Sequence, residues 1–323
     1  MKIVPLDEIR QVLDWDDAIA SIENGFRAFS AGKADLAAVG HLVFPAVDGD
    51  CHVKCASMAE ADVFVVKVAT GFYRNPSLGL PVSDGCMTLL DSTTGQPRCL
   101  LLDEGWLTNM RTAMAGAIAA RRVRGPRTGP IGIVGAGTQA HLQALLIAHV
   151  TGIRDVTIWA RNAERSRALA ATLAADGLAA SATADLWKLC AEAALVVTTT
   201  PSTNPILSEP MLPPGSRVIA IGADAPGKQE LETALVAAAD LVVVDSREQC
   251  FDHGEAGWAA RAGSLNLDRV FELGQILDGG PDIPADGRVI VDLTGIAVQD
   301  LQIARQVWEK WLRRRPSGKA ALA

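Results

Sequence analysis

The stretch Ile131-Gly132-Ile133-Val134-Gly135-Ala136-Gly137-Thr138-Gln139-Ala140 decides the fold. An apolar run of strand length leads into Gly-x-Gly-x-x-Ala, and a helix-like segment, 141–150, follows. In such a turn Gly135 allows a tight bend, Gly137 lets the backbone approach a pyrophosphate, and Ala140 lets helix and strand pack closely. The N–H groups at the helix N-terminus, around Thr138 and Gln139, then face the phosphates. The stretch predicts a dinucleotide-binding site.

Strands and helices alternate throughout the chain after Pro130. The apolar segments of strand length are Ile131–Val134, Val156–Trp159, Leu195–Thr199, Arg217–Ile221, Leu241–Val244 and Val289–Leu293. This alternation is typical of a Rossmann fold, a doubly wound parallel sheet that binds ligands at the carboxyl ends of its strands. We therefore expect an α/β protein whose dinucleotide-binding domain spans residues 123–296.

Residues 1–122 predict an α+β domain for substrate binding and dimerisation. Apolar residues three and four apart indicate a helix over 15–31, and an Ala-rich helix is expected at Leu107–Val123. The expected strands are Val39–Phe44, Cys51–Ala56, Val63–Thr70, Cys86–Asp91 and Arg98–Leu102. We expect a mostly antiparallel sheet, with a last helix over 297–314 packing back on it and a frayed end at 317–323.

Composition excludes several classes of protein. The 323 residues carry a net charge of −7, and their one basic run is Arg313–Arg315, so nucleic acid is not an expected partner. There is no apolar stretch of about 18 residues and no signal-like N-terminus, which predicts a cytoplasmic protein without a membrane span. The six cysteines lack Cys-x-x-Cys and zinc spacing, so we expect buried thiols and no metal site.

The end of the second Rossmann strand bears on the choice of cofactor. A carboxylate at this position would bind the ribose 2′-hydroxyl of NAD(H), but the chain has Arg161-Asn162 there, and Asp155 comes too early. Arg161 without a nearby acid favours the 2′-phosphate of NADP(H). If Arg161 instead stacked on adenine, it would suit NAD(H) equally well.

Polar residues follow three other strands of this domain. Thr199 ends the third strand and Thr200 follows it, and Thr294 comes after the last strand, so all three are expected at the cofactor. Asp224 lies in the loop 222–228, at the sheet edge where nicotinamide chemistry takes place. We predict that Asp224 is an acid/base; the alternative is that it caps a helix.

These features together resemble the ornithine cyclodeaminase/μ-crystallin family. The matching pieces are Val66-Lys67-Val68, Gly79-Leu80-Pro81, Leu90-Asp91 with Thr94-Gly95, Leu107-Thr108 with Arg111-Thr112-Ala113, the glycine turn, 222–228 with Glu230-Leu231, and Thr294-Gly295-Ile296-Ala297 with Gln299-Asp300. The resemblance implies homodimers built on the N-terminal domain and chemistry on a C=N bond beside a carboxylate.

The same resemblance assigns roles to individual residues. Lys67 and Arg111 would grip the substrate carboxylate, Lys67 and Asp224 would serve the chemistry, and Arg111 with Thr112 would adjoin the cofactor. A bidentate Arg with a Lys point charge suits a planar carboxylate. Two simpler interpretations stay open: Lys67 on a solvated strand face, and Arg111 paired with Asp103 or Glu104.

The chain departs from the cyclodeaminase pattern at the distal end of the substrate. Where those enzymes carry an Arg and then a Glu, the nearest residues here are His41 and Lys54. On an alternating strand His52, Lys54 and Ala56 share one face. If that face lines the pocket, its charge repels the distal ammonium of ornithine and holds a distal carboxylate. If the face is solvent-exposed, Lys54 has no such role.

We therefore expect an NAD(P)H-dependent enzyme that reduces a small imino acid to an amino acid. Iminosuccinate, which gives L-aspartate, ranks first. Alanine dehydrogenase or a cyclic ketimine/pyrroline-2-carboxylate reductase comes second, and ornithine cyclodeaminase third. The non-catalytic alternative is a cofactor-dependent binding protein similar to μ-crystallin. His41, His52 and Lys54 are the candidates for the distal group.

Overall fold

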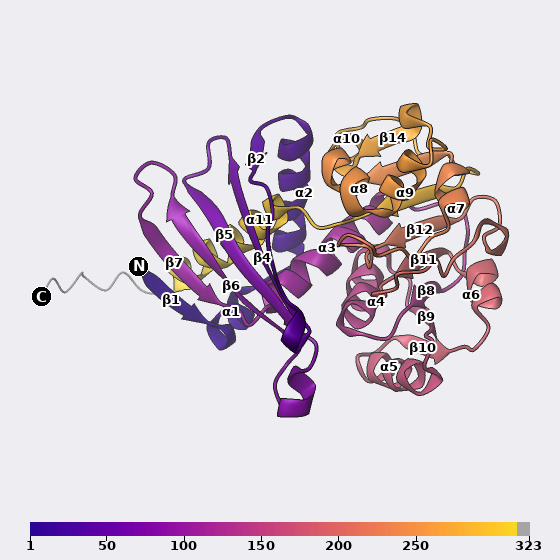
Figure 1. Cartoon of the computed structure of the whole chain (residues 1–323), viewed down its shortest axis with the longest axis horizontal. Coiled ribbons are helices and arrows are strands. Elements are labelled where there is room, and N and C mark those ends of the chain that lie inside the picture. The colour runs from indigo at the N-terminus through magenta and orange to yellow at the C-terminus, as the bar shows by residue number, and fades with distance from the viewer. Residues whose placement is uncertain (315–323) are drawn as a thin grey trace, which may run out of the picture. The chain divides into compact units, whose positions relative to one another are not determined.

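In the computed structural model of the protein, residues 1–314 are described, so the fraying expected at 317–323 lies outside them. The chain forms two compact units (Figure 1). Among the described residues, unit 1 comprises 1–111 and 297–314, and unit 2 comprises 112–296. The division lies within helix α3 (Trp106–Arg122), whereas the sequence placed it at the end of that helix.

Unit 1 is built on a seven-stranded sheet in the order β1-β7-β6-β5-β4-β2, with β3 also paired to β4. Its strands are β1 (Lys2–Pro5), β2 (Ala34–Leu36), β3 (Gly40–Phe44), β4 (Gly49–Met58), β5 (Val63–Phe72), β6 (Ser83–Asp91) and β7 (Pro97–Leu102). All neighbours are antiparallel except β1 and β7. The expected antiparallel sheet is confirmed, with the short strands β1 and β2 added.

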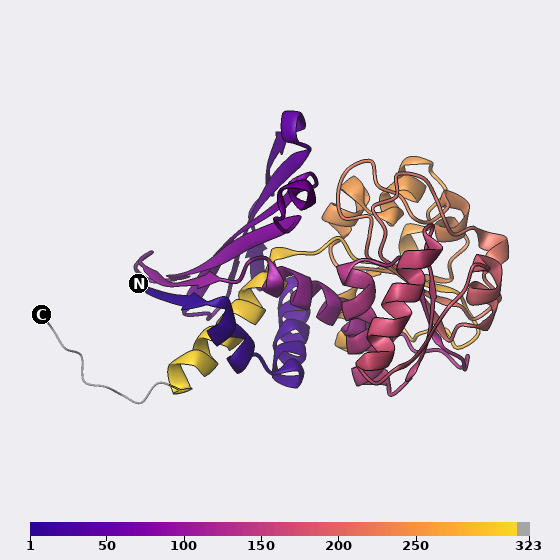
Figure 2. The same ribbon diagram turned by 90° about the horizontal axis from the view of Figure 1, so that it is seen from below.

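Three helices cover one face of this sheet: α1 (Leu6–Val12), α2 (Trp15–Ser30) and α11 (Ala297–Arg314). Helix α11 contacts α2, β4 and β5, as Figures 1 and 2 show, so its predicted return to this unit is confirmed. Gly25 permits the approach of α2, because a Cβ there would lie 2.8 Å from Cγ of Gln302. The unit therefore closes around a helix distant in sequence.

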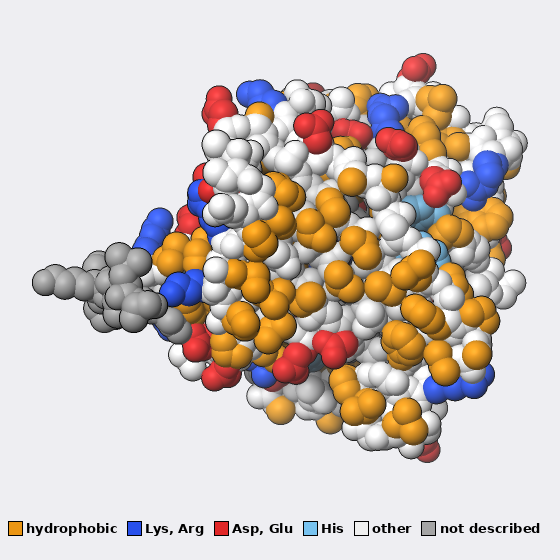
Figure 3. Space-filling view, turned by 60° about the vertical axis from the view of Figure 1, so that its left-hand side comes forward, with side chains coloured by type: hydrophobic (Ala, Val, Ile, Leu, Met, Phe, Trp, Pro, Cys, Tyr) orange, Lys and Arg blue, Asp and Glu red, His pale blue; other side chains and the backbone are white. Residues whose placement is uncertain are grey.

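The strands of unit 1 alternate as a half-covered sheet requires. On β5, Val63, Val65 and Lys67 are buried beneath the helices, and the residues between them are half-buried. The opposite face carries Leu42 on β3 and Leu102 on β7, both exposed. Figure 3 shows hydrophobic side chains spread across this side of the molecule. The sheet thus has one packed face and one exposed apolar face.

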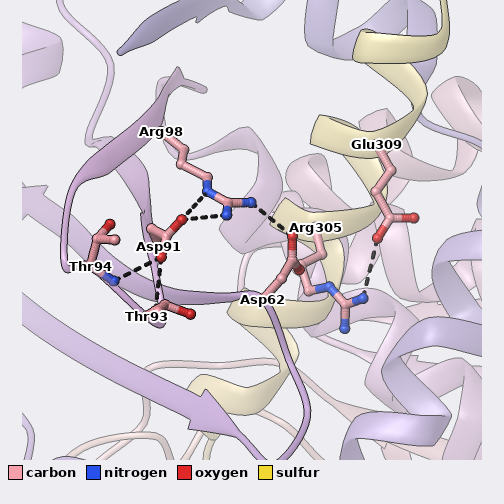
Figure 4. Close-up of polar contacts among 7 residues, drawn as sticks. All are labelled: Asp62, Asp91, Thr93, Thr94, Arg98, Arg305 and Glu309. Carbon is pink, nitrogen blue, oxygen red and sulfur yellow. Dashed lines mark hydrogen bonds and ion pairs between the residues drawn. The ribbon is translucent and has the colours of Figure 1, made fainter.

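The turn between β6 and β7 is held by Asp91 (Figure 4). One of its oxygens accepts hydrogen bonds from the backbone N–H groups of Thr93 and Thr94, each at 2.8 Å. The other binds Arg98, which also bonds Asp62 at 2.9 Å. Mainly through Arg98, the pKa of Asp91 falls to about 2. Asp91 therefore stays ionised in neutral solution and keeps its hydrogen bonds across the turn.

Unit 2 is an eight-stranded, wholly parallel sheet in the order β10-β9-β8-β11-β12-β15-β13-β14, as predicted for a Rossmann fold. Its strands are β8 (Ile131–Val134), β9 (Asp155–Trp159), β10 (Ala179–Ala182), β11 (Leu195–Thr198), β12 (Arg217–Ala220), β13 (Leu241–Val244), β14 (Val270–Glu272) and β15 (Val289–Asp292). The strand order reverses between β8 and β11, which is where such sheets bind ligands.

The helices of unit 2 follow its strands along the chain. They are α4 (Thr138–Thr151), α5 (Ala163–Ala175), α6 (Leu186–Glu192), α7 (Thr233–Ala237), α8 (Arg247–His253), α9 (Glu255–Arg261) and α10 (Leu273–Leu277). Among residues 1–314, no helix combines the length and the apolar character that crossing a membrane requires.

Arg217, at the start of β12, is buried and anchors the segment that enters the Rossmann sheet. Its Nε donates to the Val123 carbonyl at 2.7 Å, and one Nη donates to the Pro284 carbonyl, also at 2.7 Å. Gly125 leaves room for it, since a Cβ there would lie 2.9 Å from Cζ of Arg217. The other Nη donates to the Gly215 carbonyl at 2.9 Å, so the guanidinium joins three segments through their backbone carbonyls.

Candidate active site

A cavity of about 590 Å³ lies at the carboxyl ends of β8, β9 and β11. It is lined by Gly135, Ala136, Gly137, Trp159, Ala160, Arg161, Asn162, Arg165, Thr199, Thr200, Pro201, Ser202, Thr203, Asn204 and Ile206. The structure thus brings together six of the residues predicted for the cofactor. Arg165 and the segment 202–206 were missed, because no motif marks them.

The glycine turn has the geometry that its sequence predicts. Gly135 has φ 133°, and a Cβ there would lie 2.3 Å from Oγ1 of Thr199. Gly137 directly precedes α4, and a Cβ there would meet no atom within 4 Å. Ala140 is buried, whereas Thr138 and Gln139 lie in the first helical turn. The turn therefore leaves open space in front of the helix N-terminus.

The β9 end of the cavity is rich in positive charge. Arg161 and Arg165 both line it, and none of the residues around the cavity carries a carboxylate. Asn162 has a structural task, because its Oδ1 accepts hydrogen bonds from the backbone N–H groups of Glu164 and Arg165 at the start of α5. This end of the cavity suits a phosphate better than a bare hydroxyl.

Asp224 lies in the loop between β12 and α7, and its side chain is 54% exposed. Lys228 Nζ donates to its Oδ1 at 2.6 Å. The N-cap of the next helix is Glu232, so the interpretation of Asp224 as a helix cap is wrong. Its acid/base role stays a prediction.

Two other predicted cofactor residues have partners within unit 2. Thr294 is buried, donates to Oδ1 of Asp245 at 3.0 Å and accepts from Nε2 of Gln249 at 2.9 Å. Thr112 lies on α3, and its carbonyl accepts from Nε2 of Gln143 at 3.2 Å. Neither lines the cavity, so their cofactor roles stay predictions.

A second group of predicted residues meets inside unit 1. Lys54 on β4 pairs in register with Lys67 on β5, so both side chains lie on the helix-covered face. Their residues are 9% and 1% exposed. The interpretation of either lysine as a solvated surface residue is therefore wrong.

Asp300 on α11 joins this group through two ion pairs. Its Oδ2 lies 2.8 Å from Nζ of Lys67, and its Oδ1 lies 3.0 Å from Nε of Arg111. Arg111 also donates to Oε1 of Gln299 at 3.0 Å. The alternative pairing of Arg111 with Asp103 or Glu104 is wrong. Asp300 was missed as a site residue, although an acid inside an otherwise buried helical segment is a signal.

Burial sets the protonation behaviour of this cluster. Desolvation, and next the charge of Arg111, lowers the pKa of Lys67 to about 7, against the opposing effect of Asp300. Burial alone would raise the pKa of Asp300, but Lys67 and Arg111 hold it below its ordinary value. Lys67 therefore titrates near neutrality while Asp300 stays ionised.

A family model described as ornithine cyclodeaminase/mu-crystallin matches residues 3–315 of the chain. The chain belongs to this family. A putative dehydrogenase of Rhizobium meliloti is 39% identical over 309 residues, which cover 94% of each protein. The iminosuccinate reductase of Paracoccus denitrificans, solved with NAD+, is 30% identical, with a TM-score of 0.88 and 97% of each chain covered.

An archaeal alanine dehydrogenase dimer with bound NAD is 28% identical to this family member, with a TM-score of 0.87. The match covers 100% of this chain and 99% of that one. The predicted fold and family are confirmed, and two of these relatives are a reductase of an imino acid and a dehydrogenase of an amino acid.

Beside the lysines of this family member lies a pair of histidines. His41 and His52 are register partners on β3 and β4, and their rings stack with centroids 4.3 Å apart. Asp50 lies on the same face, with its Oδ1 3.8 Å from Nδ1 of His52. Imidazole lone pairs lie in the ring plane, so two rings tilted by only 7° do not aim at one metal ion.

Proposed function

We propose that this protein reduces a small imino acid to an amino acid with NAD(P)H, and that its substrate is iminosuccinate, which gives L-aspartate. The observation that carries the proposal is the buried cluster of Lys54, Lys67 and Arg111 around Asp300. Even counting Asp103, whose pKa burial raises to about 6, basic groups outnumber acidic ones. A buried excess of positive charge favours an anionic ligand.

The two ends of the substrate would be held by different members of this cluster. Arg111 offers a planar fork and Lys67 a point charge for the carboxylate beside the imine carbon. Lys54 lies one strand further along the sheet, towards His41 and His52. A second carboxylate at that end gains a charge-assisted contact, whereas the distal ammonium of ornithine is repelled.

Unit 2 would hold the cofactor in the cavity between the glycine turn and Thr199–Thr200. When bound, NAD(P)H supplies the hydride. Lys67, with its pKa near 7, and Asp224 are the residues that we assign to proton handling. Anchoring of the substrate carboxylate fixes the distance and face of the reacting carbon, which is a large part of catalysis by orientation. Arg161 and Arg165 favour NADP(H).

A substrate survey tests the proposal. The rates of NADH and NADPH oxidation should be measured with each of three substrates: iminosuccinate (oxaloacetate plus ammonia), pyruvate plus ammonia, and a cyclic ketimine. We expect the highest kcat/KM with iminosuccinate. Lys54→Met should lower that value roughly tenfold or more, because a charge-assisted contact is lost, and should change pyruvate reduction far less.

Other outcomes assign other functions. A preference for pyruvate that is indifferent to Lys54→Met indicates an alanine dehydrogenase, and a preference for the cyclic ketimine indicates a ketimine reductase. Tight cofactor binding without turnover of any of the three substrates, and without cyclisation of ornithine, indicates a binding protein. Each of these results contradicts the assignment of iminosuccinate.

We also propose a homodimer through the exposed apolar face of unit 1. Exposed apolar side chains on one face of a sheet support this interface, because they are costly to keep in water. Light scattering should give twice the chain mass. Leu42→Glu together with Leu102→Glu should yield monomers, while Leu267→Glu, at an exposed leucine of unit 2, should leave the mass unchanged. A wild-type monomer contradicts the proposal.

A further inference from the structure

Glu230 is a buried carboxylate that accepts four hydrogen bonds. Its Oε1 accepts from the backbone N–H of Thr200 at 2.6 Å and from the hydroxyl of Thr200 at 2.8 Å. Its Oε2 accepts from the hydroxyl of Thr198 at 2.7 Å and from the backbone N–H of Gly222 at 2.8 Å. Four donors converge on one side chain that lines no part of the cavity.

The groups that Glu230 binds belong to two separate loops. Thr198 ends β11, and Thr200 lines the cofactor cavity. Gly222 follows β12 and begins the loop that carries Asp224. The two loops touch here, because a Cβ at Gly222 would lie 2.1 Å from the carbonyl oxygen of Thr200. One carboxylate therefore joins the wall of the cavity to the loop of the predicted acid/base.

The backbone of Glu230 is itself held by hydrogen bonds. The carboxyl group of Glu255, buried at the start of α9, accepts from the backbone N–H groups of Glu230 at 2.6 Å and Leu231 at 3.1 Å. The Glu230 carbonyl accepts from the backbone N–H of Ile206 at 2.7 Å. The backbone of Glu230 is thus held by hydrogen bonds through both its N–H and its carbonyl. Its side chain therefore gives the two loops a fixed point of attachment.

We infer that Glu230 is a positioning residue that sets the cofactor loop and the Asp224 loop relative to each other. The inference rests on the proposed function, which makes these two loops the cofactor wall and the carrier of the acid/base. A carboxylate is required because all of its partners are donors. A Gln at this position would turn its NH₂ towards a backbone N–H that has no freedom to rotate.

The test compares Glu230→Gln with Glu232→Gln, a control at an exposed glutamate two residues away. The dissociation constant of NAD(P)H is measured by fluorescence without substrate, and kcat is measured at saturating cofactor. We expect Glu230→Gln to weaken cofactor binding roughly tenfold and to lower kcat by a similar factor, since both loops lose an anchor. Glu232→Gln should match the wild type.

Thr198→Val tests the side chain of Glu230 from a residue that does not line the cavity, because it removes one of the four donors and leaves the bonds from Thr200 and Gly222 in place. We expect losses of cofactor affinity and kcat in the same direction as in Glu230→Gln, but smaller. If Glu230 were merely structural, Glu230→Gln would lower the melting temperature but would leave the dissociation constant of NAD(P)H and kcat of the folded enzyme unchanged. If Glu230→Gln fails to fold, Glu230→Asp, which keeps the acceptors but shortens the reach, should show the same losses to a smaller degree.

Amide hydrogen exchange gives a readout that needs no activity. In Glu230→Gln, exchange should quicken in peptides covering both 198–203 and 222–228, relative to wild type and Glu232→Gln. Unchanged exchange, or unchanged cofactor affinity in a protein that binds cofactor, overturns the inference and leaves the proposed function standing. If the wild type itself binds no NAD(P)H but exchange is faster in Glu230→Gln, the result supports the tie between the loops and contradicts the proposed function.

Discussion

Lys67 Nζ lies 2.8 Å from Oδ2 of Asp300 in the interior of unit 1, although the two residues are 233 positions apart in the chain. Both side chains are almost completely buried. A buried ammonium needs a fixed counter-charge, and Asp300 provides it on the helix that returns to this unit. This ion pair allows a lysine at a core position of β5 to be buried with its charge, which the role proposed for Lys67 in binding the substrate carboxylate requires.

The Lys67–Asp300 pair predicts how substrate capture depends on pH. Lys67 is charged below its pKa of about 7 and loses that charge above it, so kcat/KM for the imino acid should fall as the pH rises through 7. Asp300→Asn removes the group that raises this pKa, and the fall should begin at lower pH. Asp17→Asn, which breaks an exposed pair with Lys310, is the control. Superimposable pH profiles would contradict the role of Asp300.

Arg161 predicts a preference between cofactors. If it binds a 2′-phosphate, Arg161→Ala should raise the KM for NADPH roughly tenfold or more and leave the KM for NADH nearly unchanged. Arg167→Ala, at an exposed arginine of α5, is the matched control. Equal increases for the two cofactors would show instead that Arg161 stacks on adenine.

Arg217 predicts a large effect on stability. Arg217→Met should lower the free energy of unfolding by about 3 kcal/mol or more, because several buried carbonyls lose their donor at once. Urea denaturation monitored by Trp fluorescence measures the change. Arg167→Met should stay within about 0.5 kcal/mol of wild type. A loss for Arg217→Met as small as that of the control would show that water replaces the guanidinium.

Two buried acids of unit 2 predict how stability depends on pH. Burial raises the pKa of Glu255 to about 9 and that of Asp292 to about 7. The native state keeps these protons where the unfolded chain has released them, so their contribution is complete below about pH 4 and is lost as the pH rises. Each group contributes a slope of about 1.4 kcal/mol per pH unit between its unfolded and folded pKa values.

The window from pH 5 to 6 separates this effect from that of Lys67, whose lowered pKa of about 7 acts in the opposite direction, because Lys67 is charged there in both states. The free energy of unfolding should fall across this window in wild type and less steeply in Glu255→Gln. Glu248→Gln, at an exposed glutamate of α8, should keep the wild-type slope. A flat wild-type curve would show that these carboxyls are ionised in the folded protein.

Elements with a strong local pattern were predicted well, and weak ones were missed. Strand β8 and helix α11 match the expected bounds, because a run of Ile and Val and an amphipathic repeat are legible within one segment. Strand β10 is Ala-Ala-Ser-Ala, which has little strand propensity of its own, and it forms because it pairs with β9. Its existence depends on a neighbour that its own residues do not reveal.

The sequence by itself determined the Rossmann unit, the glycine turn and the residue types of the proposed carboxylate site, since these follow from local periodicity and short motifs. Only the tertiary structure decided that Lys54 and Lys67 lie together on the covered face, and that Asp300 rather than a nearby acid partners Arg111. It also decided that Glu230 joins two loops. Burial and ion pairs between distant segments decide the partners and the protonation of these side chains, because each side chain is surrounded by residues far away in the chain.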